Sequence, residues 1–292
     1  MKRKRKLKTS TIILIVVCFI GLSLLLYPTV ADFYNTHFAI KSVTEYTTSI
    51  EEIEEDEFQD LWTAAVEYNQ RRSEQGTFTL PENMQLEYYS LLNVSGNGMM
   101  GFVEIPKLNL QLPIYHGTSD SVLESAIGHL EWSSLPVGGP GTHCCISGHR
   151  GLATAKLFTN LDQLREGDQF MLNIFDEMLT YEVDQIRTVL PTEMSDLAIV
   201  PEQDYCTMIT CTPYGINTHR LLVRGHRIET AEAEIRVVSE AVLIDNLMVA
   251  MFLAIPILFL LVMAVMLKKP EQKPDPDRTA SKPREVKPDE KN

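Results

Sequence analysis

The spacing of apolar positions divides the chain into stretches of three kinds. Two stretches are apolar throughout, since no charged residue occurs from Thr11 to Tyr27 or from Leu247 to Leu267. Residues 28 to 75 carry apolar positions at three- and four-residue intervals, which predicts helix. From residue 99 to about residue 230 the apolar runs are short and are divided by Gly, Pro, Asn and Asp. That pattern is typical of β-strands joined by turns.

The short apolar runs predict a β-barrel. They include "MGFVEIPKL", "LQLPIYHG", "THCCISGH", "QFMLNIF", "LTYEVDQIRTVL", "CTMITCT" and "HRLLVRGHRI". Seven or eight strands of this length favour a small closed or nearly closed barrel. Helical turns are expected at "SDSVLESAIGH" and "LFTNLDQL". Pro81, Gly96 and Gly98 interrupt the segment before the barrel, which is therefore expected to be a linker.

Both fully apolar stretches are predicted to be transmembrane helices. At about 1.5 Å per residue, roughly 20 apolar residues cross a bilayer. The first stretch follows six cations and no acid in residues 1–10, and the second ends in Lys268 and Lys269. Basic flanks remain cytoplasmic, so residues 28–246 are expected outside the cell membrane. An alternative for the first stretch is a cleaved signal peptide with a small-residue site near Thr29 to Ala31.

The sequence therefore predicts seven regions. These are a basic N-terminus (1–10), a transmembrane helix (11–27), an external helical segment that could include a lid (28–98), a β-barrel (99–230), a linker (231–246), a second transmembrane helix (247–267) and a cytoplasmic tail (268–292). The tail is Pro-rich, charged and without apolar periodicity, which predicts disorder.

The charge distribution argues against a nucleic-acid partner. The chain carries a net charge of −13, and removing the six N-terminal cations and the net +2 of the tail leaves −21 on the residues between. A nucleic-acid-binding surface would be basic. An acidic external domain suits cationic or lysine-presenting partners, although the same excess of acid is often related only to solubility.

The five cysteines do not form the pattern of a disulfide framework. Cys18 lies in the first apolar stretch. Cys144 and Cys145 are neighbours on a predicted strand and should point to opposite faces. Cys206 and Cys211 lie along one predicted strand, roughly 16 Å apart, which is too far for a disulfide. We expect some of these cysteines to be free.

Three residues could form a nucleophilic site. Cys211 ends a predicted strand, Arg220 begins the returning strand, and turn formers lie between them in "TCTPYGINTHR". His149 lies in the Gly-flanked "SGHRG". A cysteine is reactive as the thiolate, an imidazole can exchange protons with it, and a guanidinium can donate to an oxyanion. Two antiparallel strands would bring Cys211 and Arg220 together.

Each of these residues also has an ordinary structural explanation. A strand cysteine is often an inert core residue, His149 is one of seven histidines, and an arginine is often a surface charge. A metal site in "HCCISGH" is disfavoured, because strand alternation separates Cys144 from Cys145 and no C-x-x-C pair completes a zinc set. Spacing alone leaves these alternatives open.

Several separate blocks resemble the sortase family. "TMITCTPYGINTHRLLVRGHR" is similar to the sortase pattern in which a Thr-Leu-x-Thr-Cys strand precedes Thr-Pro-Tyr-Gly and ends at an Arg, with Met208 in place of the leucine. "YPTVADFYN", "GFVEIPKLNLQLPIYHGTS" and "GHLEWSSLPVGGPGTHCCISGHRGLATAKLFTNLDQLREGD" resemble class C, the pilin-polymerising sortases. The resemblance covers residue 1 to about residue 270, including the second apolar stretch.

The resemblance implies a fold, a reaction and partners. The fold would be an eight-stranded β-barrel. Cys211 would be the nucleophile, His149 the general acid/base and Arg220 the stabiliser of the oxyanion, with no cofactor and no metal. The enzyme would cut a Leu-Pro-x-Thr-Gly-like signal of a pilin or surface-protein precursor between Thr and Gly through a thioester. A lysine amine of a neighbouring pilin subunit would then form an isopeptide bond.

The sequence departs from class C at the lid. Class C members often cover the site with an Asp-Pro-aromatic motif, and this chain has no Asp between Asp60 and Asp120. Glu87, Tyr88 and Tyr89 are candidate substitutes, and an open cleft is equally compatible. Two other functions stay open: anchoring of surface proteins to peptidoglycan, and a non-enzymatic membrane-anchored β-barrel that binds a partner and has Cys211 in its core.

Overall fold

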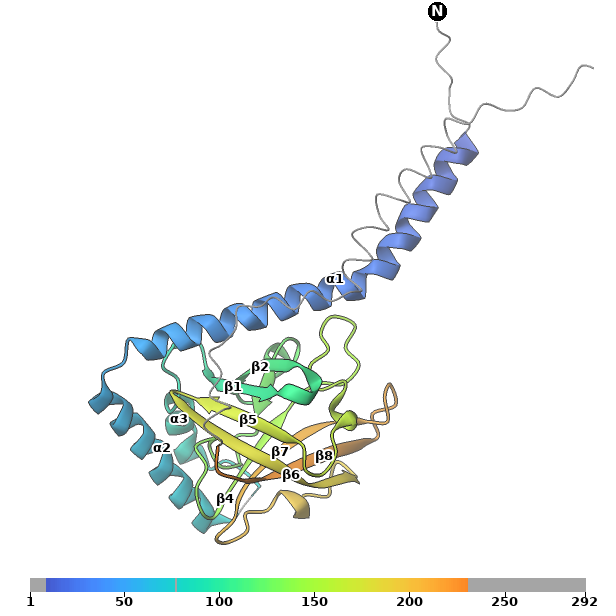
Figure 1. The fold of residues 1–292 in the computed structure, drawn as a ribbon. Helices are drawn as coiled ribbons and strands as arrows, with labels where there is room; N and C mark the ends of the chain where they lie inside the picture. The colour runs from blue at the N-terminus through green and yellow to red at the C-terminus, as the bar shows by residue number, and fades with distance from the viewer. Residues whose placement is uncertain (1–8, 77, 231–292) are drawn as a thin grey trace, which may run out of the picture. The chain divides into compact units, whose positions relative to one another are not determined.

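The short strands close into a β-barrel (Figure 1). The computed structural model describes residues 9–76 and 78–230. The order of strands around the barrel is β1-β2-β3-β4-β7-β8-β6-β5, which confirms the predicted eight-stranded architecture. The strands are β1 (Met99–Ile105), β2 (Leu110–His116), β3 (Ile127–His129), β4 (Thr142–Ser147), β5 (Gln169–Ile174), β6 (Glu177–Val189), β7 (Asp204–Thr212) and β8 (His219–Arg227).

Helices precede the barrel. They are α1 (Thr9–Glu51), α2 (Glu55–Gln75) and α3 (Glu82–Ser90), so residues 28–75 are helical as expected. Helix α3 was not predicted. Its Pro81 stands at the N-cap position, where a proline precedes a helix instead of interrupting it.

Short helical elements lie between the strands. They are α4 (Asp120–Leu123) and the 3-10 turns η1 (Pro106–Leu108), η2 (Leu161–Gln163) and η3 (Ser195–Leu197). α4 and η2 agree with the two predicted helical turns. The end of "SDSVLESAIGH", however, is strand β3, which pairs with β2 and β4.

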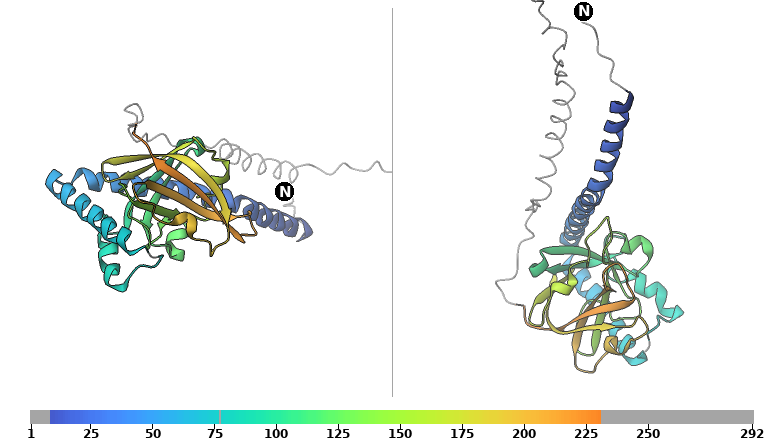
Figure 2. Two further views of the ribbon diagram at one scale, coloured as in Figure 1. Left: turned by 90° about the horizontal axis from the view of Figure 1, so that it is seen from below. Right: turned by 90° about the vertical axis from the view of Figure 1, so that its right-hand side faces the viewer.

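Helix α1 continues without a break from the predicted transmembrane segment (11–27) into the residues that lead to the barrel. Among the described residues it is the helix that is long and apolar enough to cross a membrane, with a mean hydropathy of 1.9 over an 18-residue stretch of the span Val16–Glu51. Figures 1 and 2 show its first part projecting from the barrel and its second part running beside β1 and β2. The predicted linker, second transmembrane helix and tail (231–292) lie outside the described residues.

The two faces of β4, β7 and β8 pack into different clusters. Cys144, Cys206 and Met208 belong to the main core inside the barrel, and Cys145, which follows Cys144, belongs to a smaller cluster outside it. This confirms that Cys144 and Cys145 point to opposite faces. The outer cluster contains Cys145, Leu197, Ile209 and Leu222, with Leu130, Trp132, Val189 and Met194 packed against it.

Candidate active site

Strands β7 and β8 place Cys211 opposite Arg220. The two strands are antiparallel, and Cys211 and Arg220 are direct partners in the register. Direct partners project their side chains from the same face of the sheet. The turn between them, residues 213–218, is exposed, and Cys211 and Arg220 are half-buried. The structure therefore confirms the predicted hairpin and the closeness of these two residues.

His149 is brought to the same edge of the sheet by β4, which runs parallel to β7. The last register pair is Ser147 with Ile209, so His149 lies two residues beyond β4 as Cys211 lies two residues beyond Ile209. The Gly148 N–H donates to the Ile209 carbonyl at 3.1 Å. The Thr210 hydroxyl donates to the Gly148 carbonyl at 2.8 Å. These bonds fix the turn that carries His149 against the end of β7.

Glycine is required at position 148 by a close approach of neighbouring side chains. A Cβ atom there would lie 2.5 Å from Ile127 Cδ1 and 2.9 Å from the Phe158 ring. Real Cβ atoms do not approach other atoms this closely, so a side chain would displace the turn. Gly148 thus lets the backbone before His149 pack directly against the barrel.

The thiols of the barrel differ in their access to solvent. Cys144, Cys145 and Cys206 are at most 2% exposed, whereas Cys211 is half-buried. Burial raises the pKa of the Cys145 and Cys206 thiols well above the usual value. A buried, protonated thiol is a poor nucleophile. Burial also opposes ionisation of Cys144, but hydrogen bonds with Cys206 and His129 lower the pKa of its thiol to about 6; at 2% exposure this thiol is still out of reach of a substrate. Among the cysteines of the barrel, Cys211 is therefore the one placed for reaction.

The neighbouring histidines are structural. His116, His129 and His143 are at most 6% exposed, whereas His149 is half-buried. Burial lowers the pKa of His143 to about 4, and its ring contacts the Ala198 carbonyl at 3.0 Å and the Thr207 hydroxyl at 2.7 Å. These contacts tie His143 into the sheet and away from the candidate site.

Arg220 is held by main-chain carbonyls. Its Nη1 donates to the carbonyls of Asn217 at 3.2 Å and His219 at 3.1 Å. Within residues 9–76 and 78–230, no carboxylate forms an ion pair with Arg220. Its charge is thus uncompensated by a neighbouring acid in this part of the chain. The explanation of Arg220 as one half of a surface ion pair is not supported.

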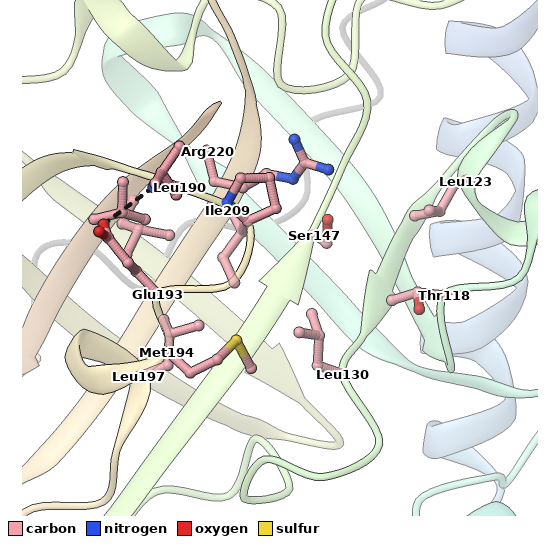
Figure 3. A pocket seen from close by; sticks show the side chains of 13 residues that line it. Thr118, Leu123, Leu130, Ser147, Leu190, Glu193, Met194, Leu197, Ile209 and Arg220 are labelled. Atoms are coloured by element: carbon pink, nitrogen blue, oxygen red, sulfur yellow. Dashed lines mark hydrogen bonds between the residues drawn. The ribbon is translucent and has the colours of Figure 1, made fainter. Parts of the chain in front are cut away.

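A groove of about 210 Å³ lies over the outer face of the sheet, and Arg220 is one of its lining residues, whereas Cys211 and His149 are not (Figure 3). In Figure 3 the guanidinium of Arg220 reaches toward Ser147. The lining is mainly apolar, with few polar groups. Its residues come from the β2–β4 region, from β4, β7 and β8, from the end of β6 and from the β6–β7 connection: Thr118, Leu123, Leu130, Ser147, Val189, Leu190, Pro191, Glu193, Met194, Leu197, Ile209, Arg220 and Leu222.

The candidate lid residues Glu87, Tyr88 and Tyr89 lie on helix α3, and none of them lines the groove. Tyr88 is fully buried, and its hydroxyl contacts His129 Nδ1 at 2.9 Å. Tyr89 bonds Glu131, and Glu87 pairs with Arg71. Tyr88 and Tyr89 attach helix α3 to the barrel, and Glu87 attaches it to helix α2. A tyrosine whose ring is buried still needs a partner for its hydroxyl.

Arg150 is a residue of this region that the sequence reading did not single out. Its guanidinium donates to the Thr212 hydroxyl at 3.2 Å, pairs with Asp162 at 2.5 Å and lies 6.0 Å from the centre of the Tyr214 ring. It therefore links the turn after His149 to the chain just after Cys211. The feature of the sequence that could have pointed to Arg150 is its position next to His149 in "SGHRG".

Comparison with known proteins identifies the family. A model of the sortase domain matches residues 103–228. Sortase C1 from Streptococcus agalactiae is 46% identical, with a TM-score of 0.64, over 65% of this chain and 100% of that chain. Clostridium perfringens sortase C, solved with a C-terminal cell wall sorting motif, is 41% identical, with a TM-score of 0.59, over 66% of this chain and 100% of that chain.

A curated relative agrees with this result. Sortase D of Bacillus subtilis (strain 168) is 30% identical over 131 residues, which are 44% of this chain and 63% of that protein. The alignment thus spans less than two thirds of that relative's own length. The barrel, the domain match and the similar structures together show that the chain belongs to the sortase family, whose members are cysteine transpeptidases.

Proposed function

We propose that this protein is a membrane-anchored transpeptidase that polymerises pilins. It would cleave a Leu-Pro-x-Thr-Gly-like signal between Thr and Gly and join the Thr carbonyl to a lysine amine of a pilin subunit. The observation that carries the proposal is the register of β7 and β8, which pairs Cys211 with Arg220, a residue that lines an apolar groove. The similarity to sortase C structures supports the choice of pilin as acceptor.

Cys211 is the proposed nucleophile. It is half-buried at a strand end, whereas the three other barrel thiols are at most 2% exposed. In the first step its thiolate attacks the Thr carbonyl carbon, and a C–S bond forms as the carbonyl π electrons move onto oxygen. When this intermediate collapses, the Thr–Gly C–N bond breaks and a thioester remains on Cys211.

His149 is the proposed general acid and base. Its turn is fixed to β7 by the two backbone bonds of Gly148, so its imidazole is held at the edge of the sheet that carries Cys211. It would give a proton to the leaving Gly amine in the first step. In the second step it would take a proton from the lysine amine, which attacks the thioester, forms the isopeptide C–N bond and releases the Cys211 thiolate.

Arg220 is the proposed stabiliser of the oxyanion. Only its Nη1 is occupied by main-chain carbonyls in the described part of the chain, so Nε and Nη2 retain N–H groups that can donate. A guanidinium stays charged throughout the reaction and donates in a fixed planar geometry. It can therefore stabilise the negative charge on the Thr carbonyl oxygen in both tetrahedral intermediates.

The groove is the proposed binding site of the sorting signal. Its apolar side chains, Leu130, Ile209 and Leu222 among them, suit the leucine and proline of such a signal. A peptide lying in it would reach Arg220 and the Cys211 end of the hairpin. Helix α1 would anchor the barrel on the outer side of the membrane, with residues 247–267 as a second transmembrane helix.

The test is to trap the intermediate and then offer it two amines. We expect the full chain, with a Leu-Pro-x-Thr-Gly peptide, to yield a Cys211 thioester detectable by mass spectrometry. A purified pilin subunit should then resolve the thioester through a lysine faster than a peptidoglycan cross-bridge peptide does. A faster reaction with the cross-bridge peptide would favour surface-protein anchoring. No thioester on Cys211 would overturn the transpeptidase mechanism.

A further inference from the structure

The loop that follows His149 is closed at its base. It runs from His149 to Phe158, and the His149 carbonyl accepts the Phe158 N–H at 3.2 Å. At the Phe158 end, Leu157 is 4% exposed and Phe158 is fully buried in the barrel core. At the His149 end, Arg150 bonds Thr212. The position of His149 thus depends on a loop whose two ends meet.

Helix α1 contacts this loop through two side chains. Asp32 Oδ1 accepts the main-chain N–H of Lys156 at 2.9 Å, and Asp32 Oδ2 lies 3.1 Å from Lys156 Nζ. The Asn35 amide donates to the Thr154 carbonyl at 2.7 Å. Asp32 and Asn35 are three positions apart and so share one face of the helix. Two of these bonds go to the loop main chain and can hold its path.

The same face of α1 is fixed to the barrel further along. Ala39, Val43 and Tyr46 continue the three- and four-residue spacing from Asn35, and each is at most 2% exposed. The Tyr46 hydroxyl donates to the Met100 carbonyl at 2.8 Å and accepts the Phe175 N–H at 2.9 Å. Asp32 and Asn35 are therefore presented to the loop by a helix that is itself anchored.

We propose that Asp32 and Asn35 are positioning residues for His149. By holding the loop main chain at Thr154 and Lys156, they keep the imidazole in its place beside the end of β7. The part of α1 just outside the predicted transmembrane segment then belongs to the working active site as well as to the anchor. This inference rests on the roles proposed above for Cys211 and His149.

The expected consequence is a loss of rate without a loss of binding. A displacement of a catalytic group by about 1 Å can cost up to about 100-fold in rate. We therefore expect Asp32→Ala/Asn35→Ala in the full chain to lower the rate of thioester formation by about 10- to 100-fold. KM for the signal peptide should change by less than about twofold, because neither residue lines the groove.

A graded series of variants separates positioning from simple helix stability. Asp32→Asn keeps an acceptor for the Lys156 N–H and should retain most of the rate. Lys156→Ala removes the ion pair with Asp32 but keeps both main-chain bonds, and it should change the rate by less than about twofold. The matched control is Lys41→Ala/Glu45→Ala, which removes an exposed pair on the same helix away from the loop. It should behave like the wild type.

A second measurement does not depend on the substrate. The pH dependence of Cys211 alkylation by iodoacetamide, followed on the Cys211 peptide by mass spectrometry, reports whether an imidazolium lies beside the thiolate. We expect the alkylation profile of Asp32→Ala/Asn35→Ala to move to higher pH and that of the control to stay. Hydrogen exchange should also become faster in residues 151–158 and stay unchanged in β4 and β7.

The outcomes distinguish this inference from the proposed function. If the folded Asp32→Ala/Asn35→Ala variant matches the control in rate and in alkylation profile, the positioning role is overturned. If the double variant does not fold, Asp32→Ala alone is compared with Asp32→Asn, and equal rates overturn the inference. If the wild type forms no thioester, the proposed function fails, and an unchanged alkylation profile would overturn the positioning role as well.

Discussion

The paired strands β4 and β7 have one histidine and one cysteine near each end, and the surroundings of the two ends differ. At one end lie His143 and Cys206, and at the other lie His149 and Cys211. Cys206 is fully buried, and burial lowers the pKa of His143 to about 4. Cys211 and His149 are half-buried beside an exposed turn. His143 and Cys206 are therefore shielded from solvent, whereas His149 and Cys211 are accessible from it.

The local sequence does not distinguish the two cysteines. Each is followed by threonine on the strand "YCTMITCT", and both belong to β7. The difference arises because Cys206 points into the barrel and is opposite Cys144, whereas Cys211 is opposite Arg220 at the open edge. Reactivity therefore depends on position in the barrel more than on the neighbouring residues in the chain.

The largest expected effect comes from replacing Cys211 with alanine, compared with the same replacement at Cys206. Cys211→Ala should abolish transpeptidation with folding unchanged, because only the nucleophile is lost. Cys206→Ala should keep most of the activity per folded molecule. The measurement is peptide turnover together with thermal unfolding of each variant. Turnover by Cys211→Ala near the wild-type rate would show that Cys211 is no more important for the reaction than Cys206.

A second variant tests Arg220, the residue opposite Cys211 on strand β8. Arg220→Lys keeps a positive charge but cannot reproduce the planar donor geometry. We expect the rate of thioester formation to fall on the order of 10²–10³-fold, the cost of removing one oxyanion donor. Single-turnover acylation followed by mass spectrometry measures it. Near-native acylation would reduce Arg220 to a structural residue.

A third prediction concerns the buried end and its pH dependence. The pKa of His143 is about 4 in the folded protein and 6.5 in the reference state, so between these values the unfolded chain binds more protons. The free energy of unfolding should therefore rise with pH from about 4 to 6.5, by on the order of 3 kcal/mol from this residue. Below pH 4 this contribution is lost.

Urea unfolding across that pH range checks the third prediction. His143→Gln should be less stable at pH 7, because its contacts with Ala198 and Thr207 are altered. Its stability should depend less steeply on pH than that of the wild type. Equal slopes for the two proteins would show that His143 does not titrate differently on folding.

The smallest expected effect comes from a hydroxyl placed in the barrel core. Cys206→Ser should lower the free energy of unfolding by about 1–3 kcal/mol, the cost of burying a polar group without a full set of partners. Activity per folded molecule should remain. Cys211→Ser should show the reverse, with stability preserved and activity lost. A similar stability loss in both would mean that Cys211 is as buried in solution as Cys206.

The sequence by itself determined much of this protein. Short apolar runs divided by turn formers predicted the barrel, and the turn formers between Cys211 and Arg220 predicted their hairpin. These features depend on local spacing, which strand periodicity and turn chemistry make readable. The roles of Cys211, His149 and Arg220 remain predictions. Helix α3 was missed because Pro81, read as a break, stands at its start.

Only the tertiary structure decided which segments distant in the chain meet. The parallel pairing of β4 with β7 brings the His149 turn to Cys211, and the packing of α1 brings Asp32 and Asn35 to the loop after His149. The groove forms because the β6–β7 connection lies over the outer face of the sheet. Such contacts depend on the packing of whole elements, and no local pattern in the sequence records them.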